Sequence, residues 1–272
     1  LSPKIKFLGQ FIAVFILMTQ PDFRILSLHG FMGMDEIPLV LSVLGTLFFL
    51  LGLINAFNLI DGIDGLTGIT GIIVASFYSY MFYHLGSYFY LAIGTTTIAT
   101  LLAFLRFNFS KKRKIFMGDT GSLVIGLVLG LLTLKLMTLK NAAASFPFNP
   151  EQLPLFLIGV LFIPVLDIMR VMALRAFKGV SMFKPDRNHI HHIIVDFGLT
   201  HSKASLFIGG VNFMVALVMF NVIQIFSSIQ SGIILISMFL FAIIILFLMN
   251  KNRAAIQQKL KIRKSMLSFW SL

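Results

Sequence analysis

The chain has 272 residues, of which 58% are hydrophobic and 12% are charged, and its mean hydropathy is +0.95. This composition excludes a soluble globular domain and is typical of a multi-pass membrane protein. The formal net charge of +12 would point to nucleic acid in a soluble protein, but here the attraction of basic loops to anionic lipid explains most of it. Without any cysteine, the chain has neither disulfides nor thiol chemistry.

About eight apolar segments approach the length of roughly 20 residues that a spanning helix needs. They cover residues 5–20, 38–57, 66–84, 88–105, 118–139, 153–176, 204–226 and 231–250. The first is short, and we expect it to be tilted or partial. Because no soluble domain or internal repeat stands out, residues 1–272 are predicted to form one all-α, polytopic membrane helix bundle. The basic tail, residues 251–272, is predicted to be an amphipathic helix at the membrane surface.

Lysine and arginine are distributed unequally between the two sets of loops. All but three of the 22 basic residues fall on the side that holds the N-terminus, the tail, and the loops after the second, fourth and sixth segments. The exceptions are Arg24, Lys135 and Lys140. Because basic loops remain in the cytoplasm, that side is predicted to be cytoplasmic. The three polar motifs of the chain lie on the same side.

The first polar motif, N-A-F-N-L-I-D-G-I-D-G-L-T-G, begins at Asn55, between two apolar segments. Asn55, Asn58 and Asp61 are three residues apart, so on a helix they form one stripe. Gly62 allows a ligand to approach the backbone closely. A tight turn is the alternative, since Asp-Gly is common in turns. The doubled Asp-Gly, which includes Asp64, favours a functional site, because acids at a membrane edge are costly.

The second motif, F-M-G-D-T-G-S, opens the fifth apolar segment. Asp119 would either cap this helix or bind a hard cation while the helix N-terminus attracts phosphate. Taken alone, the residues leave both interpretations open. Mg²⁺ prefers a few protein oxygens together with substrate phosphates, and Asp119 and Asn58 could supply such oxygens. The preceding basic run, residues 110–114, is interpreted as an anchor on the cytoplasmic side.

The third motif, K-P-D-R-N-H-I-H-H, lies in the longest predicted cytoplasmic loop and contains Arg187, His189, His191 and His192. A zinc site is one alternative, but the chain lacks cysteine and its acids do not occur at metalloprotease spacing. A solvated loop is another. Arginine together with imidazoles suits an anionic phosphate group better than either.

Three further polar residues are given no firm role. Asp167 and Arg170 lie three residues apart in the sixth segment, so a pair within that helix is the default interpretation, with a part in the site as the alternative. His201 is interpreted as incidental.

Taken together, N-x-x-N-x-x-D-G-x-D-G-L, F-M-G-D-T-G-S and P-D-R-x-H-I-H-H resemble the motifs of the polyprenyl-phosphate N-acetylhexosamine-1-phosphate transferases, glycosyltransferase family 4. The likeness covers nearly the whole chain. Ile190 interrupts the run of three histidines that the pentapeptide branch carries, so the motif is similar to that of the N-acetylglucosamine branch. The resemblance implies a bacterial cell-membrane enzyme that transfers N-acetylglucosamine-1-phosphate, or a related amino-sugar phosphate, from a UDP-sugar to undecaprenyl phosphate and releases UMP. This step initiates cell-envelope glycans such as lipopolysaccharide or teichoic acid.

The resemblance also implies roles for individual residues. The catalytic residues would be Asp61, Asp64, Asp119 and His191. The substrate-binding residues would be Asn58, Gly62, Asp64, Phe116, Arg187, His189, His191 and His192. Asp119 and Asn58 would hold Mg²⁺, with Mn²⁺ as an alternative, and Phe116 would stack on uracil. Membrane lipids and a second copy in a homodimer are the further partners, and nucleic acid is not one.

The beginning of the chain departs from the family pattern. The family carries an aspartate pair just before a segment like L-S-P-K-x-K-F-L-G-Q, and this chain begins at that leucine. The family usually has about ten or eleven spans, so we expect an N-terminally truncated form that is inactive alone. A non-catalytic fragment or pseudoenzyme of the family is the alternative. A transporter is less favoured, because the polar residues gather at one face rather than at the midplane.

Overall fold

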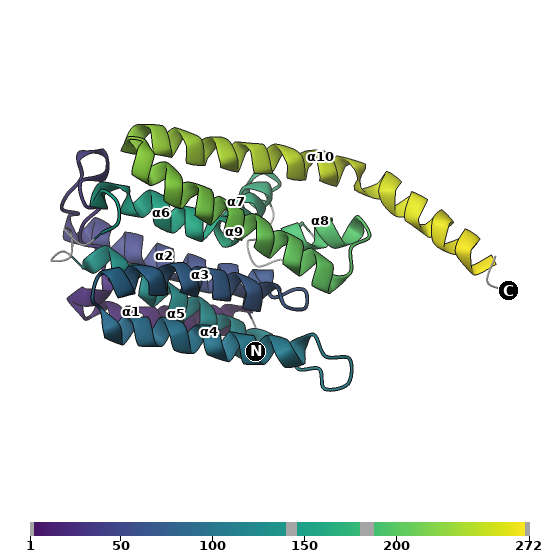
Figure 1. The fold of residues 1–272 in the computed structure, drawn as a ribbon, viewed down its shortest axis with the longest axis horizontal. Coiled ribbons are helices and arrows are strands. Elements are labelled where there is room, and N and C mark those ends of the chain that lie inside the picture. The colour runs from purple at the N-terminus through teal and green to yellow at the C-terminus, as the bar shows by residue number, and fades with distance from the viewer. Residues whose placement is uncertain (1–2, 140–145, 180–187, 270–272) are drawn as a thin grey trace.

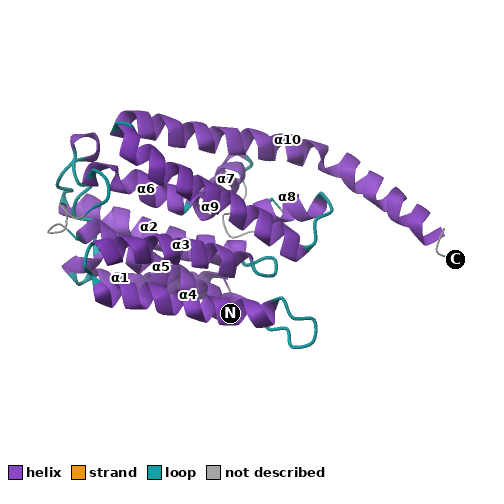
Figure 2. Ribbon diagram, viewed as in Figure 1, coloured by secondary structure: helices purple, strands orange, loops and turns teal. Residues whose placement is uncertain are grey.

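The structure is a computed structural model that describes residues 3–139, 146–179 and 188–269. In these ranges the regular structure is helical, without a named strand (Figures 1 and 2). The longer helices are α1 (Pro3–Met18), α2 (Leu39–Ile60), α3 (Leu66–His84), α4 (Tyr88–Asn108), α5 (Gly118–Thr138), α6 (Leu153–Val160), α7 (Phe162–Phe177), α8 (Ile190–Asp196), α9 (His201–Ile225) and α10 (Ser228–Phe269). Single 3₁₀ turns lie at Pro21–Phe23, Phe31–Gly33 and Pro150–Gln152.

The prediction of an all-α polytopic bundle is confirmed. Six of the described helices are long and apolar enough to cross a membrane, and α6 with α7 would add a seventh if the bent pair is one span. About eight spans were predicted. The difference lies in α1, which has only 16 residues, fewer than the roughly 20 that a span needs. The predicted tail helix is not a separate element, because α10 continues without a break for 42 residues and extends beyond the bundle in Figure 1.

The spans divide into a central group and a peripheral pair. In α3, 61% of the apolar stretch is buried, and in α5 and α2 the shares are 50% and 39%, against 17% in α4 and 11% in α10. Phe57, Tyr78 and Phe82 of the central helices α2 and α3 are among the largest fully buried side chains. Helices α4 and α10 expose leucines and phenylalanines such as Leu102 and Phe247. These two helices therefore present the apolar surface that lipid covers in a membrane.

Close packing of α2 and α5 brings the first two motifs to the same end of the bundle. A methyl group built on Gly126 of α5 would lie 2.8 Å from the Ile54 Cα of α2. In a membrane the hydrophobic effect does not drive helices together, so small residues at the interface let dispersion contacts hold them. This contact fixes Asn58, one turn beyond Ile54, relative to the N-terminal end of α5.

The chain bends by 70° between α6 and α7, so the single span predicted for residues 153–176 is two helices. Leu161, at the break, has φ −91° and ψ 19°. A break frees backbone groups, which cannot stay unpaired in an apolar interior. The fully buried Asn212 of α9 satisfies two of them. Its Oδ1 accepts from the Ile163 N–H at 2.9 Å, and its Nδ2 donates to the Val160 carbonyl at 3.0 Å.

The bend can be tested with two asparagines of α9. Asn212→Leu should lower the free energy of unfolding by about 2–4 kcal/mol, because two buried backbone groups lose their partner. Asn221→Leu is the matched control, since Asn221 is exposed and its Nδ2 bonds to the Leu217 carbonyl of its own helix. Unfolding of the purified proteins in detergent measures both changes. Equal losses in the two variants would contradict a special role for Asn212.

Candidate active site

The three polar motifs meet at one end of the bundle. In Figure 1 the turn between α2 and α3, the loop between α4 and α5, and helix α8 all lie at the right-hand end, and the loop between α1 and α2 lies at the other. The side chains at this end form three linked groups. Each group joins residues from different motifs or from distant helices.

The first group joins α1, α2 and α5. Asn58 donates from its Nδ2 to Asp119 Oδ1 at 3.0 Å and to Ser122 Oγ at 2.9 Å. Lys6 of α1 forms an ion pair with Asp119 Oδ2. Asp119 lies inside the first turn of α5, whose N-cap residue is Met117 and has no side-chain cap bond. Asp119 is therefore not the cap of this helix, and its carboxylate is directed to partners on other helices.

Asp61 lies at the C-terminal end of α2, close enough to Asp119 for the two charges to interact. Burial raises the pKa of Asp61 to about 6 from an ordinary value of 3.8, and the negative charge of Asp119 acts in the same direction. Asp61 thus has its titration midpoint about one unit below neutral pH. A carboxyl group in that range can exchange its proton readily or give it up to an arriving cation.

The donor set fits a hard cation that completes its coordination with oxygens from elsewhere. The Asp119 side chain is 53% exposed, and an ammonium group already pairs with it, so the space in front of this carboxylate accepts positive charge. In the part of the chain that the structure describes, no three His, Cys, Asp or Glu side chains converge as in a protein cage. Mg²⁺ is commonly held by one or two carboxylates, with waters and substrate phosphates as the other ligands.

The second group centres on Asp64, whose side chain is 17% exposed. Lys114 donates to Asp64 Oδ2 at 2.7 Å, and His201 Nδ1 lies 3.5 Å from the same oxygen. Ser205 of α9 donates to the Asp64 carbonyl. Phe116 is 74% exposed, with Lys114 Nζ 5.1 Å from its ring centroid. Lys114 and His201, which were predicted to be an anchor and an incidental residue, thus both contact a candidate site residue.

The third group brings the His-containing helix α8 to the first motif. A methyl group on Gly62 would lie 2.1 Å from His191 Nε2, so only glycine allows the imidazole to lie here. Asp167 of α7 holds the start of α8, because its Oδ1 accepts from the Ile190 N–H at 2.8 Å and its Oδ2 accepts from His189 Nδ1 at 2.9 Å. Asp167 and His189 are both buried. The default interpretation placed the partner of Asp167 within its own helix, but Asp167 bonds to the start of α8.

The far end of α8 is held as well. Asp196, its last residue, forms an ion pair with Arg253 of α10. Arg170 of α7 donates to the Asn188 carbonyl just before the helix. A helix of 7 residues is too short to be stable by itself, so these contacts with α7 and α10 determine its position.

His191 is the most unusual side chain of the site. It is 2% exposed, and neither ring nitrogen has a hydrogen-bond partner among the described residues. Its ring stacks on that of His189 at 5.7 Å and lies 4.2 Å from that of His192. Burial lowers the pKa of His191 to about 3, and a charge on His192 acts in the same direction. His191 is thus neutral at physiological pH, with one ring nitrogen a donor and the other an acceptor. Because buried polar groups normally have partners, these two nitrogens are available to a ligand.

One predicted site residue lies outside the described part of the chain, and one residue that was not predicted contacts the site. Arg187 lies outside the described residues, so its contact with phosphate stays a prediction. Lys6 was counted only among the basic residues, although it contacts Asp119. The spacing of Lys6 and Gln10 could have indicated a role for Lys6, because residues four apart share one face of α1. Gln10 also faces the first motif, since its Oε1 accepts a hydrogen bond from Asn55 Nδ2 at 2.7 Å.

Fold and site together define a multi-pass membrane protein in which acidic, lysine and imidazole groups meet at one end of a helix bundle. Sequence comparison then places the chain among known proteins. The family described as Glycosyl transferase family 4 matches residues 1–137, half of the chain, and the chain belongs to this family. The family resemblance seen in the motifs is thereby confirmed.

Three relatives of this family are similar to parts of the chain. The undecaprenyl-phosphate alpha-N-acetylglucosaminyl 1-phosphate transferase of Haemophilus influenzae is 35% identical over 115 residues, which cover 41% of this chain and 30% of the relative. The protein of the same name from Escherichia coli is 32% identical over 114 residues, 41% of this chain and 29% of the relative. The probable undecaprenyl-phosphate N-acetylglucosaminyl 1-phosphate transferase of Bacillus subtilis is 32% identical over 158 residues, which cover 58% of this chain and 40% of the relative. The matched part thus spans less than half the length of each.

The anchoring of α8 can be tested with Asp167→Asn. Asparagine can still accept from the Ile190 N–H, but its amide group would face the N–H of His189, so one of the two bonds is lost. We expect backbone amides of α8 to exchange with deuterium about tenfold faster, as the loss of one charged hydrogen bond predicts. Asp22→Asn, which removes a surface pair with Lys135 at the opposite end, is the control. Unchanged exchange in α8 would show that Asp167 does not hold it.

The raised pKa of Asp61 gives a prediction with a definite sign. Between about pH 4 and pH 6 the folded chain binds more protons at Asp61 than the unfolded chain, so the contribution of Asp61 to stability is largest below about pH 4 and is lost as the pH rises through about 6. Asp61→Asn should remove this decline. The measurement is the difference in unfolding temperature between wild type and variant across this range, with Asp22→Asn as control. A difference that does not change with pH would contradict the prediction.

Proposed function

We propose that this chain contributes the nucleotide and metal site of a transferase that moves N-acetylglucosamine-1-phosphate, or a related amino-sugar phosphate, from a UDP-sugar to undecaprenyl phosphate. Family membership and the names of the relatives support the proposal and do not favour a transporter. The structural observation that carries it is the meeting of three motifs at one end of the bundle, through Asn58 with Asp119, Asp64 with Lys114, and Gly62 with His191.

In the proposed reaction an oxygen of the lipid phosphate forms a bond to the β-phosphorus of the UDP-sugar. The bond between that phosphorus and the bridging oxygen breaks, and UMP leaves with the electron pair. Charge accumulates on the phosphate oxygens, so catalysis requires positive charge and hydrogen-bond donors around them. Lys6 and Lys114 bring two ammonium groups to the site, and each already pairs with a site carboxylate.

Asp119 and Asn58 would hold the metal ion, Mg²⁺ or alternatively Mn²⁺. When bound, it would neutralise charge on the diphosphate. Asp61, whose pKa is about 6, is already mostly ionised at neutral pH, and the positive charge of the metal would favour the ionised form further. Asp61, Asp64 and Asp119 would thus all be negative and would confine the cations of the site to its centre.

Substrate recognition would use the remaining residues of the three motifs. The exposed ring of Phe116 is free to stack on uracil, with Gly62 and Asp64 beside it. His191, neutral and without a described partner, would donate to a diphosphate or sugar oxygen without adding charge. His189 and His192 flank it, and Arg187 would supply a planar fork for phosphate.

The proposed site faces the cytoplasm of a bacterial cell. The three motifs share their end of the bundle with the basic loops, and basic loops remain on the cytoplasmic side. UDP-sugars are water-soluble, so a site at the inner membrane surface can take its donor from solution and its acceptor from the bilayer. A homodimer stays a prediction.

The test is release of UMP from UDP-N-acetylglucosamine in the presence of undecaprenyl phosphate. The chain is assayed as it stands and with an N-terminal segment of the Bacillus subtilis relative added, and we expect the extended chain to release UMP. Chelation should stop release, and added Mg²⁺ should restore it.

In the extended chain, Asp119→Asn should lower turnover by at least about 100-fold, because it removes a metal ligand and its charge. Asp22→Asn, at the opposite end of the bundle, should leave turnover unchanged. Near-normal turnover of Asp119→Asn at saturating Mg²⁺ would contradict the metal role. Failure of the extended chain to release UMP with any UDP-amino sugar would contradict the proposed function.

A further inference from the structure

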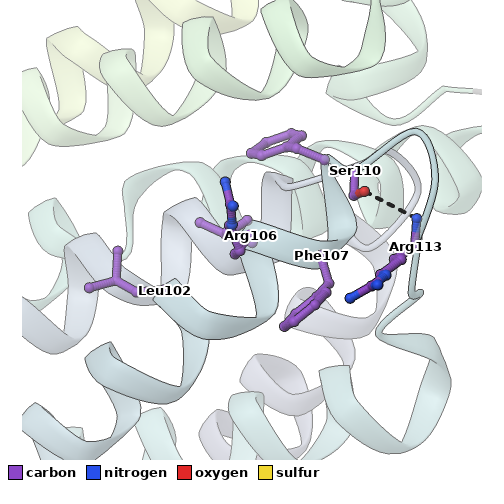
Figure 3. Close-up of a pocket in the computed structure, with 7 residues that line it drawn as sticks. Leu102, Arg106, Phe107, Ser110 and Arg113 are labelled. Atoms are coloured by element: carbon purple, nitrogen blue, oxygen red, sulfur yellow. Dashed lines mark hydrogen bonds between the residues drawn. The ribbon is translucent and has the colours of Figure 1, made fainter.

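A pocket of about 650 Å³ lies at the C-terminal end of α4 and uses none of the residues assigned to the proposed reaction. Figure 3 shows the side chains around it. Part of the lining is apolar and consists of Leu102, Leu105, Phe107 and Phe109. The polar part consists of Arg106, Ser110 and Arg113. The pocket thus combines an apolar wall with two guanidinium groups.

The two arginines carry positive charge that is not neutralised within the described chain. Arg106 lies in the last turn of α4 and Arg113 in the following loop, and both are exposed. The ion pairs among described residues join other basic groups to carboxylates. Ser110 Oγ accepts from the Arg113 backbone N–H at 3.1 Å, a bond drawn in Figure 3. This turn keeps Arg113 beside the helix end.

The apolar wall is continuous with the surface that faces lipid. Helix α4 is the second least buried span, with 17% of its apolar stretch covered, and Leu102 and Phe107 are 55% and 43% exposed. Arg106 lies at the end of the span, where basic side chains reach the headgroup layer of a membrane. An occupant of the pocket would therefore have its apolar part in the hydrocarbon and its polar part at the level of the headgroups.

The pocket is separated from the candidate active site by its own lining. The Phe109 ring packs on Gly65, where an added methyl group would lie 2.1 Å from the ring, and Leu105 packs on Gly68 in the same way. Both side chains fill the space between the pocket and the start of α3. A phosphate group bound between Arg106 and Arg113 would thus lie on the lipid side of Phe109. Asp61 and Asp64 belong to the turn on the other side of that ring.

We propose that this pocket binds the headgroup of an anionic membrane glycerophospholipid such as phosphatidylglycerol. Its phosphate lies between Arg106 and Arg113, and its acyl chains run along Leu102 and Phe107. Charge complementarity selects an anionic lipid over a zwitterionic one, because guanidinium groups form strong bonds to phosphate oxygens. A bound lipid would hold Phe109 against Gly65 and so support the turn that carries Asp61 and Asp64. The inference does not depend on the proposed transferase activity.

The experiment measures lipid binding to the purified 272-residue chain in neutral detergent by native mass spectrometry, with phosphatidylglycerol and phosphatidylcholine of equal acyl length. We expect one saturable phosphatidylglycerol per chain, bound at least about tenfold more tightly than phosphatidylcholine. Arg106→Gln/Arg113→Gln should abolish this preference. Lys111→Gln/Lys112→Gln is the matched control, because it removes the same charge from exposed residues of the same loop that do not line the pocket. It should keep the preference within about twofold.

A second measurement does not depend on the arginine variant folding. The chain contains no cysteine, so Ser110→Cys provides a single thiol in the pocket, and phosphatidylglycerol should slow its labelling by a maleimide where phosphatidylcholine does not. Equal binding of the two lipids, or equal losses in the arginine and lysine variants, would overturn the proposal in favour of diffuse surface charge. Displacement of phosphatidylglycerol by an equimolar polyprenyl phosphate would also overturn it and make the pocket an acceptor site.

Discussion

The need to pair every polar group in an apolar helix bundle determines how this site is built. Asn212 pairs the backbone groups freed between α6 and α7, and this pairing accommodates the bend of 70° between the two helices. Helix α7 then carries Asp167 to the start of α8, where it accepts two hydrogen bonds. Through these bonds His191 comes to lie on Gly62. One buried asparagine on α9 is thus linked, through hydrogen bonds and a final packing contact, to the backbone turn of the first motif.

Two of the three acids of the site each pair with a lysine from a distant segment of the chain. Asp119 pairs with Lys6, and Asp64 pairs with Lys114. Asp61 has no such cation beside it among the residues that the structure describes, and burial raises its pKa to about 6. His191 is held neutral by burial. The site therefore combines fixed ion pairs and a neutral imidazole with one carboxyl group, that of Asp61, whose protonation responds to what binds, a combination suited to a ligand that carries several negative charges.

Much of this arrangement follows from sequence patterns, and the remainder depends on contacts between distant helices. The three-residue spacing of Asn55, Asn58 and Asp61 and the asymmetry of basic loops suffice to place the motifs at one end. Hydropathy predicts the spans but not the break at Leu161, because the segment stays apolar throughout and the bend depends on a partner in α9. In the sequence, Asp167 is interpreted as pairing with Arg170 within one helix. Its bonds to the start of α8 could not be predicted in this way, because they join residues 22 and 23 positions apart.

The ion pair between Asp196 and Arg253 has a practical consequence for handling the protein. Helix α10 continues well past the bundle (Figure 1), and an engineer choosing where to attach a purification tag or a fluorescent reporter would regard the whole of this extension as dispensable. The pair sets a boundary within that part. Fusions placed after Arg253 leave the support of α8 intact, whereas a junction placed before it removes the ion pair by which α10 holds the end of α8.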